Sequence, residues 1–331
     1  MRALVTGGTG FLGRAVVQRL ADRGDAVRVI ARGKMAGRLP PGVEWAGGDV
    51  AKLGAADDAA AGCDIVFHLA AKAGIAGPEA EYRRVNVEGT KLVIGACRRR
   101  GVPRLVYTST PAVVFDGRDM EGADESAPYS IRHLAAYPAT KAEAERLVLA
   151  ANGPNLATVA LRPHLVWGPG DNHLVPRLLA RARAGTLRRV GPGTNRVDST
   201  YIDNAADAHL LAADRLAPGS PVAGKAYFVT NGEPLPLGDL VDRILAAAGL
   251  PKCTRSVSPG TAYAAGWVFE TVHRLLGSDG EPRMTRFLAR EMSTAHWFDI
   301  AAARRDLGYE PRVSIDEGMA RLAAWLKERK A

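Results

Sequence analysis

The sequence has few cysteines, few aromatic residues and no long apolar run. Its 331 residues include only Cys63, Cys97 and Cys253, which form no CxxC pair and have no histidines at metal-ligand spacing. We therefore expect buried thiols in a reducing compartment, without disulfides and without a metal site. The chain contains no run of eighteen apolar residues, and its start carries no signal-peptide pattern, which predicts a cytoplasmic protein.

Arginine gives the chain most of its net charge of +9, notably in the runs at 98–100 and 181–189. Such a balance can indicate nucleic acid, an anionic membrane surface or acidic small molecules as partners. Aromatic residues make up only 6% of the chain and are not interleaved with the basic runs, as base stacking would require. We therefore predict no nucleic-acid partner.

Short β-rich runs alternate with amphipathic helical stretches through the first half of the chain. This alternation predicts right-handed βαβ crossovers and a doubly wound, mostly parallel α/β sheet. The runs are strands at 2–6, 26–31, 64–71 and 104–110 and helices at about 10–23 and 82–100, followed by a strand at 158–168.

Glycine and proline become frequent after the strand at 158–168, although "KAYFVTN" still fits a strand of the main sheet. We predict a dinucleotide-binding Rossmann domain at 1–168, to which 198–232 returns. A smaller, discontinuous substrate-binding lobe is expected from 169–197 and 233–331.

An apolar-rich amphipathic helix is expected at 262–276, "AYAAGWVFETVHRLL". Its apolar face can pack on the second lobe, cap a pocket or contact a membrane surface. Packing on the lobe is the favoured interpretation, because such stripes usually face a core.

The stretch "VTGGTGFLGRAVV" follows the first strand and opens the first helix. Glycines in this context permit a tight turn and let the backbone approach a pyrophosphate, while the helix N-terminal amides bind the anion. The sequence therefore predicts a dinucleotide site that includes Gly7, Gly10, Phe11, Leu12 and Gly13.

The second strand ends in "VRVIARGK", which puts Arg32 where dinucleotide-binding folds often carry an acidic residue. A carboxylate there binds the ribose 2′-hydroxyl of NAD, whereas an arginine can pair with the 2′-phosphate of NADPH. We therefore expect NADPH rather than NAD, with a solvated surface Arg32 as the alternative. Asp49 and Val50 of "GGDV" are placed near the adenine, although Asp49 can equally cap a helix.

A tyrosine and a lysine stand one helical turn apart in "AYPATK". Tyr137 and Lys141 share one helix face, and Pro138 marks the first turn of that helix. A nearby ammonium would lower the pKa of the phenol, so that Tyr137 could exchange a proton. Ser109 and Thr110 end the strand at 104–110, where a hydroxyl can hold a substrate carbonyl oxygen.

The motifs "TGGTGFLG", "FHLAA", "NVEGT", "YTST", "YPATK" and "LRPHLVWGPGD" are similar to those of extended short-chain dehydrogenases/reductases of the 3β-hydroxysteroid dehydrogenase branch. The resemblance covers nearly the whole chain. It implies that Tyr137 and Lys141 are the catalytic pair and also contact the cofactor. Thr110 occupies the position that is normally serine, which is a conservative departure.

The same resemblance implies further cofactor contacts. Ala70 and Ala71 match positions that line the cofactor, and Pro163 matches the segment whose backbone holds the carboxamide. Lys72 follows these alanines and is expected near the phosphates. Asn86 matches the family's helix asparagine, either as a direct participant in catalysis or as a buried amide that braces the neighbouring strand.

Two stretches, "ALRPHLVWGPGDNHLVPRLL" and "KAYFVTNGEPLPLGDL", resemble more narrowly the bacterial reductases of long-chain olefin biosynthesis. That resemblance implies reduction of the 3-ketone of a large apolar β-keto acid, a 2-alkyl-3-oxoalkanoate. A basic residue such as Arg196 is a candidate to meet its carboxylate, with a plain surface cation as the alternative for Arg196. The same resemblance also implies a homodimer formed through helices near 85–100 and 138–151, and contacts with other enzymes of that pathway.

Three other functions remain open from the sequence. A 3β-hydroxysteroid or sterol-carboxylate dehydrogenase and a nucleotide-sugar epimerase would use the same motifs. A non-catalytic dinucleotide sensor could share the fold, since fold does not fix function, but it would not need Tyr137 and Lys141.

Overall fold

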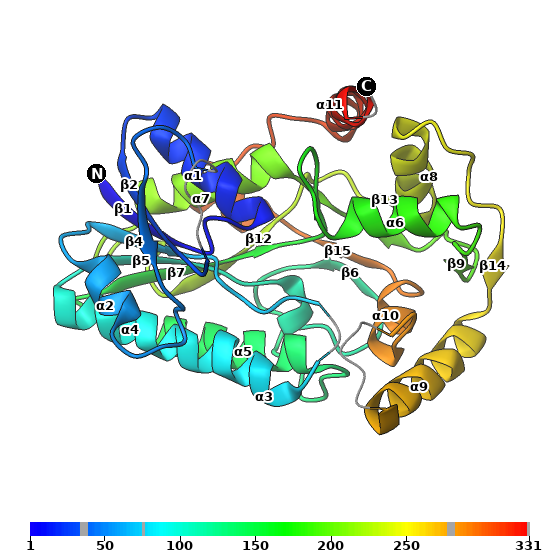
Figure 1. The fold of residues 1–331 in the computed structure, drawn as a ribbon, viewed down its shortest axis with the longest axis horizontal. Helices are drawn as coiled ribbons and strands as arrows, with labels where there is room; N and C mark the ends of the chain where they lie inside the picture. Colours follow the sequence, from blue (N-terminus) through cyan, green and yellow to red (C-terminus); the bar gives the residue numbers. More distant parts are fainter. Residues whose placement is uncertain (34–38, 75–76, 277–281, 330–331) are drawn as a thin grey trace.

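Seven parallel strands form the central sheet of the protein. The computed structural model describes residues 1–33, 39–74, 77–276 and 282–329 (Figure 1). The strand order is β12-β7-β5-β4-β1-β2-β3, and every neighbouring pair is parallel. This confirms the predicted doubly wound α/β fold. The strands are β1 (Arg2–Thr6), β2 (Ala26–Ala31), β3 (Glu44–Gly47), β4 (Ile65–His68), β5 (Arg104–Thr108), β7 (Ala157–Pro163) and β12 (Lys225–Val229).

Helices cover both faces of this sheet, with α1 and α7 on one side and α2, α4 and α5 on the other (Figure 1). Side chains alternate between the two faces along each strand. Val5 and Val29 are buried beneath α1 and α7, whereas Leu4 and Ile30 are buried beneath α2 and α4. The helices are α1 (Phe11–Asp22), α2 (Ala55–Ala60), α3 (Glu79–Tyr82), α4 (Gly89–Arg100), α5 (Ala136–Ala150) and α7 (Ile202–Arg215).

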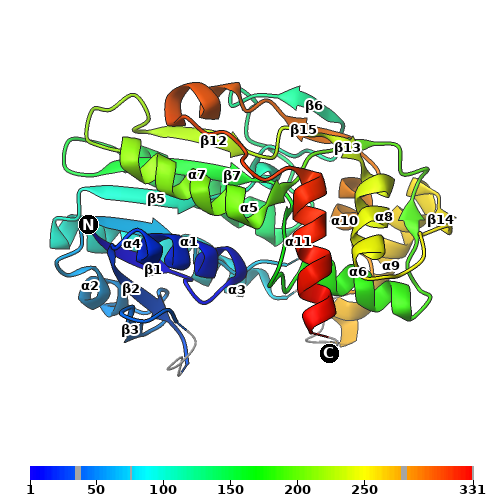
Figure 2. The same cartoon turned by 90° about the horizontal axis from the view of Figure 1, so that it is seen from above.

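The carboxyl ends of the central strands face a second lobe, which gathers at one end of the sheet (Figure 2). A four-stranded sheet in the order β13-β10-β15-β6 and two strand pairs, β9 with β14 and β8 with β11, complete the fold. These strands are β6 (Met120–Ala123), β8 (Val166–Trp167), β9 (Arg189–Val190), β10 (Arg196–Val197), β11 (Thr200–Tyr201), β13 (Leu235–Pro236), β14 (Ser256–Val257) and β15 (His296–Phe298). The helices beyond the central sheet are α6 (Leu174–Arg183), α8 (Leu237–Ala247), α9 (Pro259–Leu276), α10 (Arg286–Glu291) and α11 (Ile315–Glu328).

Two predicted elements differ in detail from the structure. The strand expected at 158–168 is interrupted, because Leu165 has a φ of 41° and turns the chain between β7 and β8. The helix expected at 82–100 begins as a π-helix over Arg83–Glu88 and continues as α4. Neither feature has a periodicity that a sequence reveals.

Segments from the C-terminal part of the chain contribute to both hydrophobic cores, that of the central sheet and that of the second lobe. Ile300, Leu307 and Tyr309 pack in the core beneath α1 and α7, although they fall in the range predicted for the second lobe. Ile315 and Leu322 of α11 pack in the core of the second lobe. We therefore propose that residues 298–309 belong with the dinucleotide-binding domain and that α11 belongs with the substrate-binding lobe.

All three cysteines are buried and free. Within the part of the chain that the structure describes, no helix has both the length and the apolar character needed to span a bilayer.

Candidate functional site

The glycine loop is packed so closely that side chains cannot be added to it. Gly7 has a φ of 69°, and a Cβ atom there would lie 2.7 Å from the backbone nitrogen of Ala70. A Cβ at Gly13 would lie 2.1 Å from the Gly7 carbonyl oxygen. The N–H of Gly10, the residue before α1, donates to the same carbonyl at 2.9 Å. The loop and the start of α1 thereby form a cradle for a pyrophosphate.

A cavity of about 250 Å³ opens beside this loop, at the carboxyl ends of β1, β2 and β4. It contains seven of the residues predicted for the cofactor. Phe11 and Leu12 pack against neighbouring cores instead. Gly13, Lys72 and Pro163 are not part of the cavity wall. The predicted residues on the wall are Gly7, Gly10, Arg32, Asp49, Val50, Ala70 and Ala71.

Arg32 and Asp49 lie on the same cavity wall. The Asp49 carboxylate accepts hydrogen bonds from the Ala51 N–H and from Arg84, both at 3.0 Å. Burial would raise the pKa of Asp49, but these bonds and the charges of Arg84 and Arg32 lower it overall. Asp49 therefore stays ionised and closes the turn that follows β3. It does not cap a helix, because the residue before α2 is Gly54.

Lys72 and Asn86 have structural partners. The Lys72 ammonium pairs with the Glu81 carboxylate at 2.8 Å, so the structure directs Lys72 to Glu81 rather than to the cofactor cavity. Asn86 accepts from the Lys72 N–H at 2.7 Å and donates to the Lys72 carbonyl and to the Thr140 hydroxyl, both at 3.1 Å. These contacts favour the bracing role for Asn86 over direct participation in catalysis.

Tyr137 is the second residue of α5, and Lys141 follows one turn later. The Lys141 ammonium is buried, donates to the Thr108 carbonyl at 2.6 Å and lies 4.1 Å from the centre of the Tyr107 ring. Because Thr108 ends β5, this bond ties α5 to the strand that leads into Ser109 and Thr110. These tertiary contacts fix the position of Lys141 on the helix face that it shares with Tyr137.

The structure separates the two candidate hydroxyl groups. The Thr110 hydroxyl accepts from the Ala112 N–H at 3.3 Å, and its influence on the Tyr137 phenol acts to lower the pKa of that phenol. Ser109 is buried, and its hydroxyl has no hydrogen-bond partner among the described residues. The geometry favours Thr110 as the partner of Tyr137.

The pKa of Tyr137 is raised in the structure, whereas the sequence led us to expect that a nearby ammonium would lower it. Burial raises the pKa of Tyr137 to about 12, despite the influence of Thr110. Burial also lowers the pKa of Lys141 to about 7, against the opposing charge of Glu145. The protein chain alone therefore holds Tyr137 as a neutral phenol, which is the form that can give a proton to a ketone oxygen.

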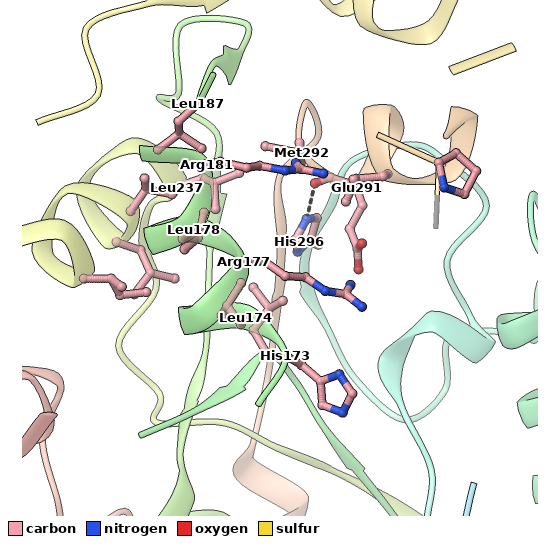
Figure 3. Close-up of a pocket in the computed structure, with 16 residues that line it drawn as sticks. His173, Leu174, Arg177, Leu178, Arg181, Leu187, Leu237, Glu291, Met292 and His296 are labelled. Atoms are coloured by element: carbon pink, nitrogen blue, oxygen red, sulfur yellow. Dashed lines mark hydrogen bonds between the residues drawn. The ribbon is translucent and has the colours of Figure 1, made fainter. Parts of the chain in front are cut away.

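A second cavity of about 270 Å³ lies in the second lobe (Figure 3). Its wall is mostly apolar, with the polar side chains of Arg177, Arg181, Glu291 and the two histidines as exceptions. The lining residues are Leu165, His173, Leu174, Arg177, Leu178, Arg181, Leu187, Leu237, Leu240, Val241, Ile244, Pro282, Leu288, Glu291, Met292 and His296.

The basic residues on this cavity wall differ from Arg196, the residue that the sequence offered for the substrate carboxylate. Arg196 lies on β10 and donates to the Pro234 carbonyl at 3.0 Å, and it does not line the cavity. Arg177 and Arg181 do so from α6. In the sequence Arg181 is one residue of the basic run at 181–189. Its spacing gives no indication that it lines a cavity.

Comparison with known proteins identifies the family. A model of the 3-beta hydroxysteroid dehydrogenase/isomerase family matches residues 4–258. The chain belongs to this family. It is an NAD(P)-dependent oxidoreductase of the extended short-chain dehydrogenase/reductase type.

Similar members of the family share most of the chain. The 2-alkyl-3-oxoalkanoate reductase of Stenotrophomonas maltophilia is 53% identical, covering 98% of this chain and 99% of that protein. The protein of the same name from Shewanella oneidensis is 49% identical, over 98% and 86%. The human sterol-4-alpha-carboxylate 3-dehydrogenase, decarboxylating, is 34% identical, over 97% and 87%. The structure of MoeE5 with UDP-glucuronic acid and NAD has a TM-score of 0.76 and 26% identity, with both chains covered completely.

A buried ion pair supports α5, the helix that carries Tyr137 and Lys141, in this 3β-hydroxysteroid dehydrogenase family member. Glu145 follows Lys141 by one turn and accepts from Arg162 of β7 at 2.6 Å and from the Tyr129 hydroxyl at 2.7 Å. Both side chains of the ion pair are at least 97% buried. The charge of Glu145 also acts to keep Lys141 protonated. Sequence reasoning missed this pair because its two members come from separate elements.

We predict that Glu145→Gln lowers the free energy of unfolding by about 3–5 kcal/mol, because it leaves the Arg162 guanidinium buried without its counter-charge. Glu143→Gln on the same helix is the matched control. It breaks an exposed pair with Arg83 and should cost less than about 1 kcal/mol. Urea unfolding of the two variants measures the difference, and equal losses would contradict a special role for the buried pair.

Proposed function

We propose that this protein uses NADPH to reduce the 3-ketone of a 2-alkyl-3-oxoalkanoate to the 3-hydroxy acid. The proposal rests on Tyr137, whose pKa burial raises to about 12 and whose phenol is influenced by Thr110, and on an apolar cavity in the second lobe large enough to hold part of an acyl chain. The two bacterial relatives at 53% and 49% identity carry the name of that activity. An olefin or hydrocarbon pathway would be its setting.

The residues divide the chemistry among them. Thr110 orients the ketone oxygen by a hydrogen bond, and Tyr137 gives that oxygen its proton. Lys141, held by the Thr108 carbonyl, places a positive charge near the phenolate that remains. NADPH bound in the cavity beside the glycine loop would supply the hydride.

Two features of the cofactor cavity support NADPH over NADH. Arg32 lies on the wall at the end of β2, where its guanidinium can pair with a 2′-phosphate. Asp49, an acidic residue on the same cavity wall, already accepts hydrogen bonds from Arg84 and from the Ala51 N–H. Its charge is therefore partly compensated, which weakens its repulsion of a phosphate.

Oligomer and surface contacts belong to the same proposal. The helices α4 and α5 lie side by side on one face of the sheet (Figures 1 and 2), and we propose this pair as the homodimer interface. The exposed apolar side chains of α9, among them Trp267, Leu275 and Leu276, would contact a membrane surface or another enzyme of the pathway. Both arrangements would suit a lipid-like substrate.

A sterol-4-carboxylate dehydrogenase is a second candidate. The human protein of that name is 34% identical over nearly the whole chain, and its named substrate also carries a carboxylate next to the reacting carbon. The apolar cavity would hold part of a sterol as well as part of an acyl chain. The direction of the reaction and the cofactor distinguish the two candidates.

The direct test follows NADPH absorbance with purified protein. A 2-alkyl-3-oxoalkanoate should be reduced, whereas a sterol-4-carboxylate with NAD should not be oxidised. Tyr137→Phe should lower kcat by at least about 100-fold, because the proton donor is removed. NADPH binding, measured by fluorescence, should be retained. Near-normal turnover by Tyr137→Phe would rule out the proposed role of the phenol.

The two neighbouring hydroxyl residues allow a matched comparison. We expect Thr110→Val to lower kcat by about 100-fold, because the ketone oxygen loses its hydrogen-bond donor. Ser109→Ala removes a hydroxyl from the adjacent residue and should change kcat by less than about threefold, because that hydroxyl has no partner to lose. Steady-state kinetics of both variants checks the assignment, which would be reversed if Ser109→Ala were the slower enzyme.

Cofactor preference can be tested at one position. Arg32→Ala should raise KM for NADPH by about 10- to 100-fold, because a charge-assisted hydrogen bond to the 2′-phosphate is lost. The KM for NADH serves as the internal control and should change little. An equal rise for both cofactors would instead assign Arg32 a structural role.

A further inference from the structure

A chain of buried hydrogen bonds runs from the cofactor cavity to the helix of Tyr137, with His68 at its centre. His68 ends β4 and pairs in register with Thr6, the last residue of β1. The side chain of His68 is fully buried. Buried polar groups are costly unless they are hydrogen-bonded, and both ring nitrogens of His68 have partners. Neither nitrogen takes part in the proton transfer proposed for Tyr137.

One end of this chain holds the wall of the cofactor cavity. The Thr6 hydroxyl lies 2.7 Å from Nδ1 of His68 and accepts from the Ala70 N–H at 3.1 Å. Ala70 lines the cofactor cavity, as does Gly7, the residue after Thr6. A Cβ atom on Gly7 would lie 2.7 Å from the Ala70 nitrogen, so these two segments of the wall are in direct contact. A shift of the Thr6 side chain would therefore displace the wall.

The other end of the chain reaches α5. Nε2 of His68 lies 3.0 Å from the Thr90 hydroxyl, and that hydroxyl donates to the Asn86 carbonyl at 2.6 Å. The Asn86 side-chain amide donates to the Thr140 hydroxyl at 3.1 Å. The Thr140 hydroxyl donates in turn to main-chain carbonyls of the first turn of α5, that of Tyr137 included, at 3.1 Å. The chain therefore ends on the turn that carries the phenol.

The direction of the hydrogen bonds in the chain follows from one hydroxyl proton. A threonine hydroxyl has a single hydrogen, and that of Thr90 is given to a carbonyl, which can only accept. Thr90 must therefore accept from His68, which places the ring hydrogen on Nε2. Nδ1 of a neutral ring is then an acceptor, and Thr6 donates to it while accepting from the Ala70 N–H. Burial and the charge of Lys141 lower the pKa of His68 to about 3, which agrees with a neutral ring.

We propose that His68, as the neutral tautomer with its hydrogen on Nε2, is a positioning residue that links the cofactor cavity to the helix of Tyr137. Its Nδ1 side fixes the cavity wall through Thr6, and its Nε2 side fixes α5 through Thr90. One ring thereby aligns the cofactor cavity with the phenol that gives the proton. The inference rests on the proposed function for the substrate of the turnover assay, but not for the tautomer or for cofactor binding.

Nitrogen NMR of protein that carries isotope-labelled histidine tests the tautomer directly. At neutral pH the signals of His68, assigned as those absent from the His68→Asn variant, should show a protonated Nε2 and an unprotonated Nδ1. A ring with its hydrogen on Nδ1, or a doubly protonated ring, would overturn the proposal. The measurement needs neither cofactor nor substrate, so its result does not depend on the proposed function.

Two variants of His68 each keep one half of the chain. Asparagine can place its amide oxygen near the former Nδ1, and glutamine can place its amide N–H near the former Nε2. His68→Asn should keep NADPH affinity within about threefold but lower kcat for a 2-alkyl-3-oxoalkanoate by about tenfold, because buried partners at the α5 end lose a hydrogen bond. His68→Gln should weaken NADPH binding by about tenfold and keep kcat within about threefold. Equal effects of the two variants on both quantities would overturn the proposal.

Two buried threonines provide a matched comparison. Thr90→Val removes the hydroxyl between His68 and Asn86 and should lower kcat about as much as His68→Asn does, with NADPH affinity kept. Thr158→Val makes the same change on β7, where the hydroxyl has no hydrogen-bond partner among the described residues, and should behave as the wild type. Equal kinetics of the two variants would contradict the role of the chain. Thermal unfolding shows that each variant is folded.

The outcomes separate the role of His68 from the proposed function. Failure of the wild-type protein to reduce the keto acid would overturn the proposed function alone. The NMR signals and the NADPH affinities of the variants would still decide whether His68 acts as proposed.

Discussion

The hydrogen bond from the Lys141 ammonium to the Thr108 carbonyl, 2.6 Å long, is the contact on which the site depends. It joins the second turn of α5 to the end of β5. Tyr137 lies in the first turn of that helix, and Thr110 lies two residues after the end of that strand. An ammonium in such a buried place loses hydration, which is why burial moves the pKa of Lys141 down to about 7. The Glu145 carboxylate, itself held by Arg162, opposes that loss of charge from one turn further along the helix.

The second lobe places its chemistry at the same edge of the sheet. Parallel strands deliver their carboxyl ends to one side, and the lobe closes over that side with α6, α10 and β15. The cofactor cavity is lined by residues at the ends of β1, β2 and β4, and the apolar cavity is lined mainly by α6, α8 and α10.

The parts of the site that could be predicted from the sequence are those encoded locally. The glycine loop and the Tyr137–Lys141 pair depend on spacing within one element, and spacing is visible in a sequence. Thr110 and Ser109 could not be ranked, because the direction of each hydroxyl depends on how the chain leaves β5. Arg177, Glu291 and His296 come from three segments that only tertiary packing brings together, and several strands of the second lobe have just two residues. Arg196, a sequence candidate for the substrate carboxylate, does not line the apolar cavity, and net charge does not show which surface a side chain faces.

Leu165 shows how backbone conformation and substrate fit are linked. A leucine with a φ of 41° is in a region that costs of order 1–3 kcal/mol for a branched side chain, and its side chain forms part of the wall of the apolar cavity. Glycine would relieve the conformational cost but would remove that part of the wall. The same leucine therefore trades backbone stability for a narrower cavity.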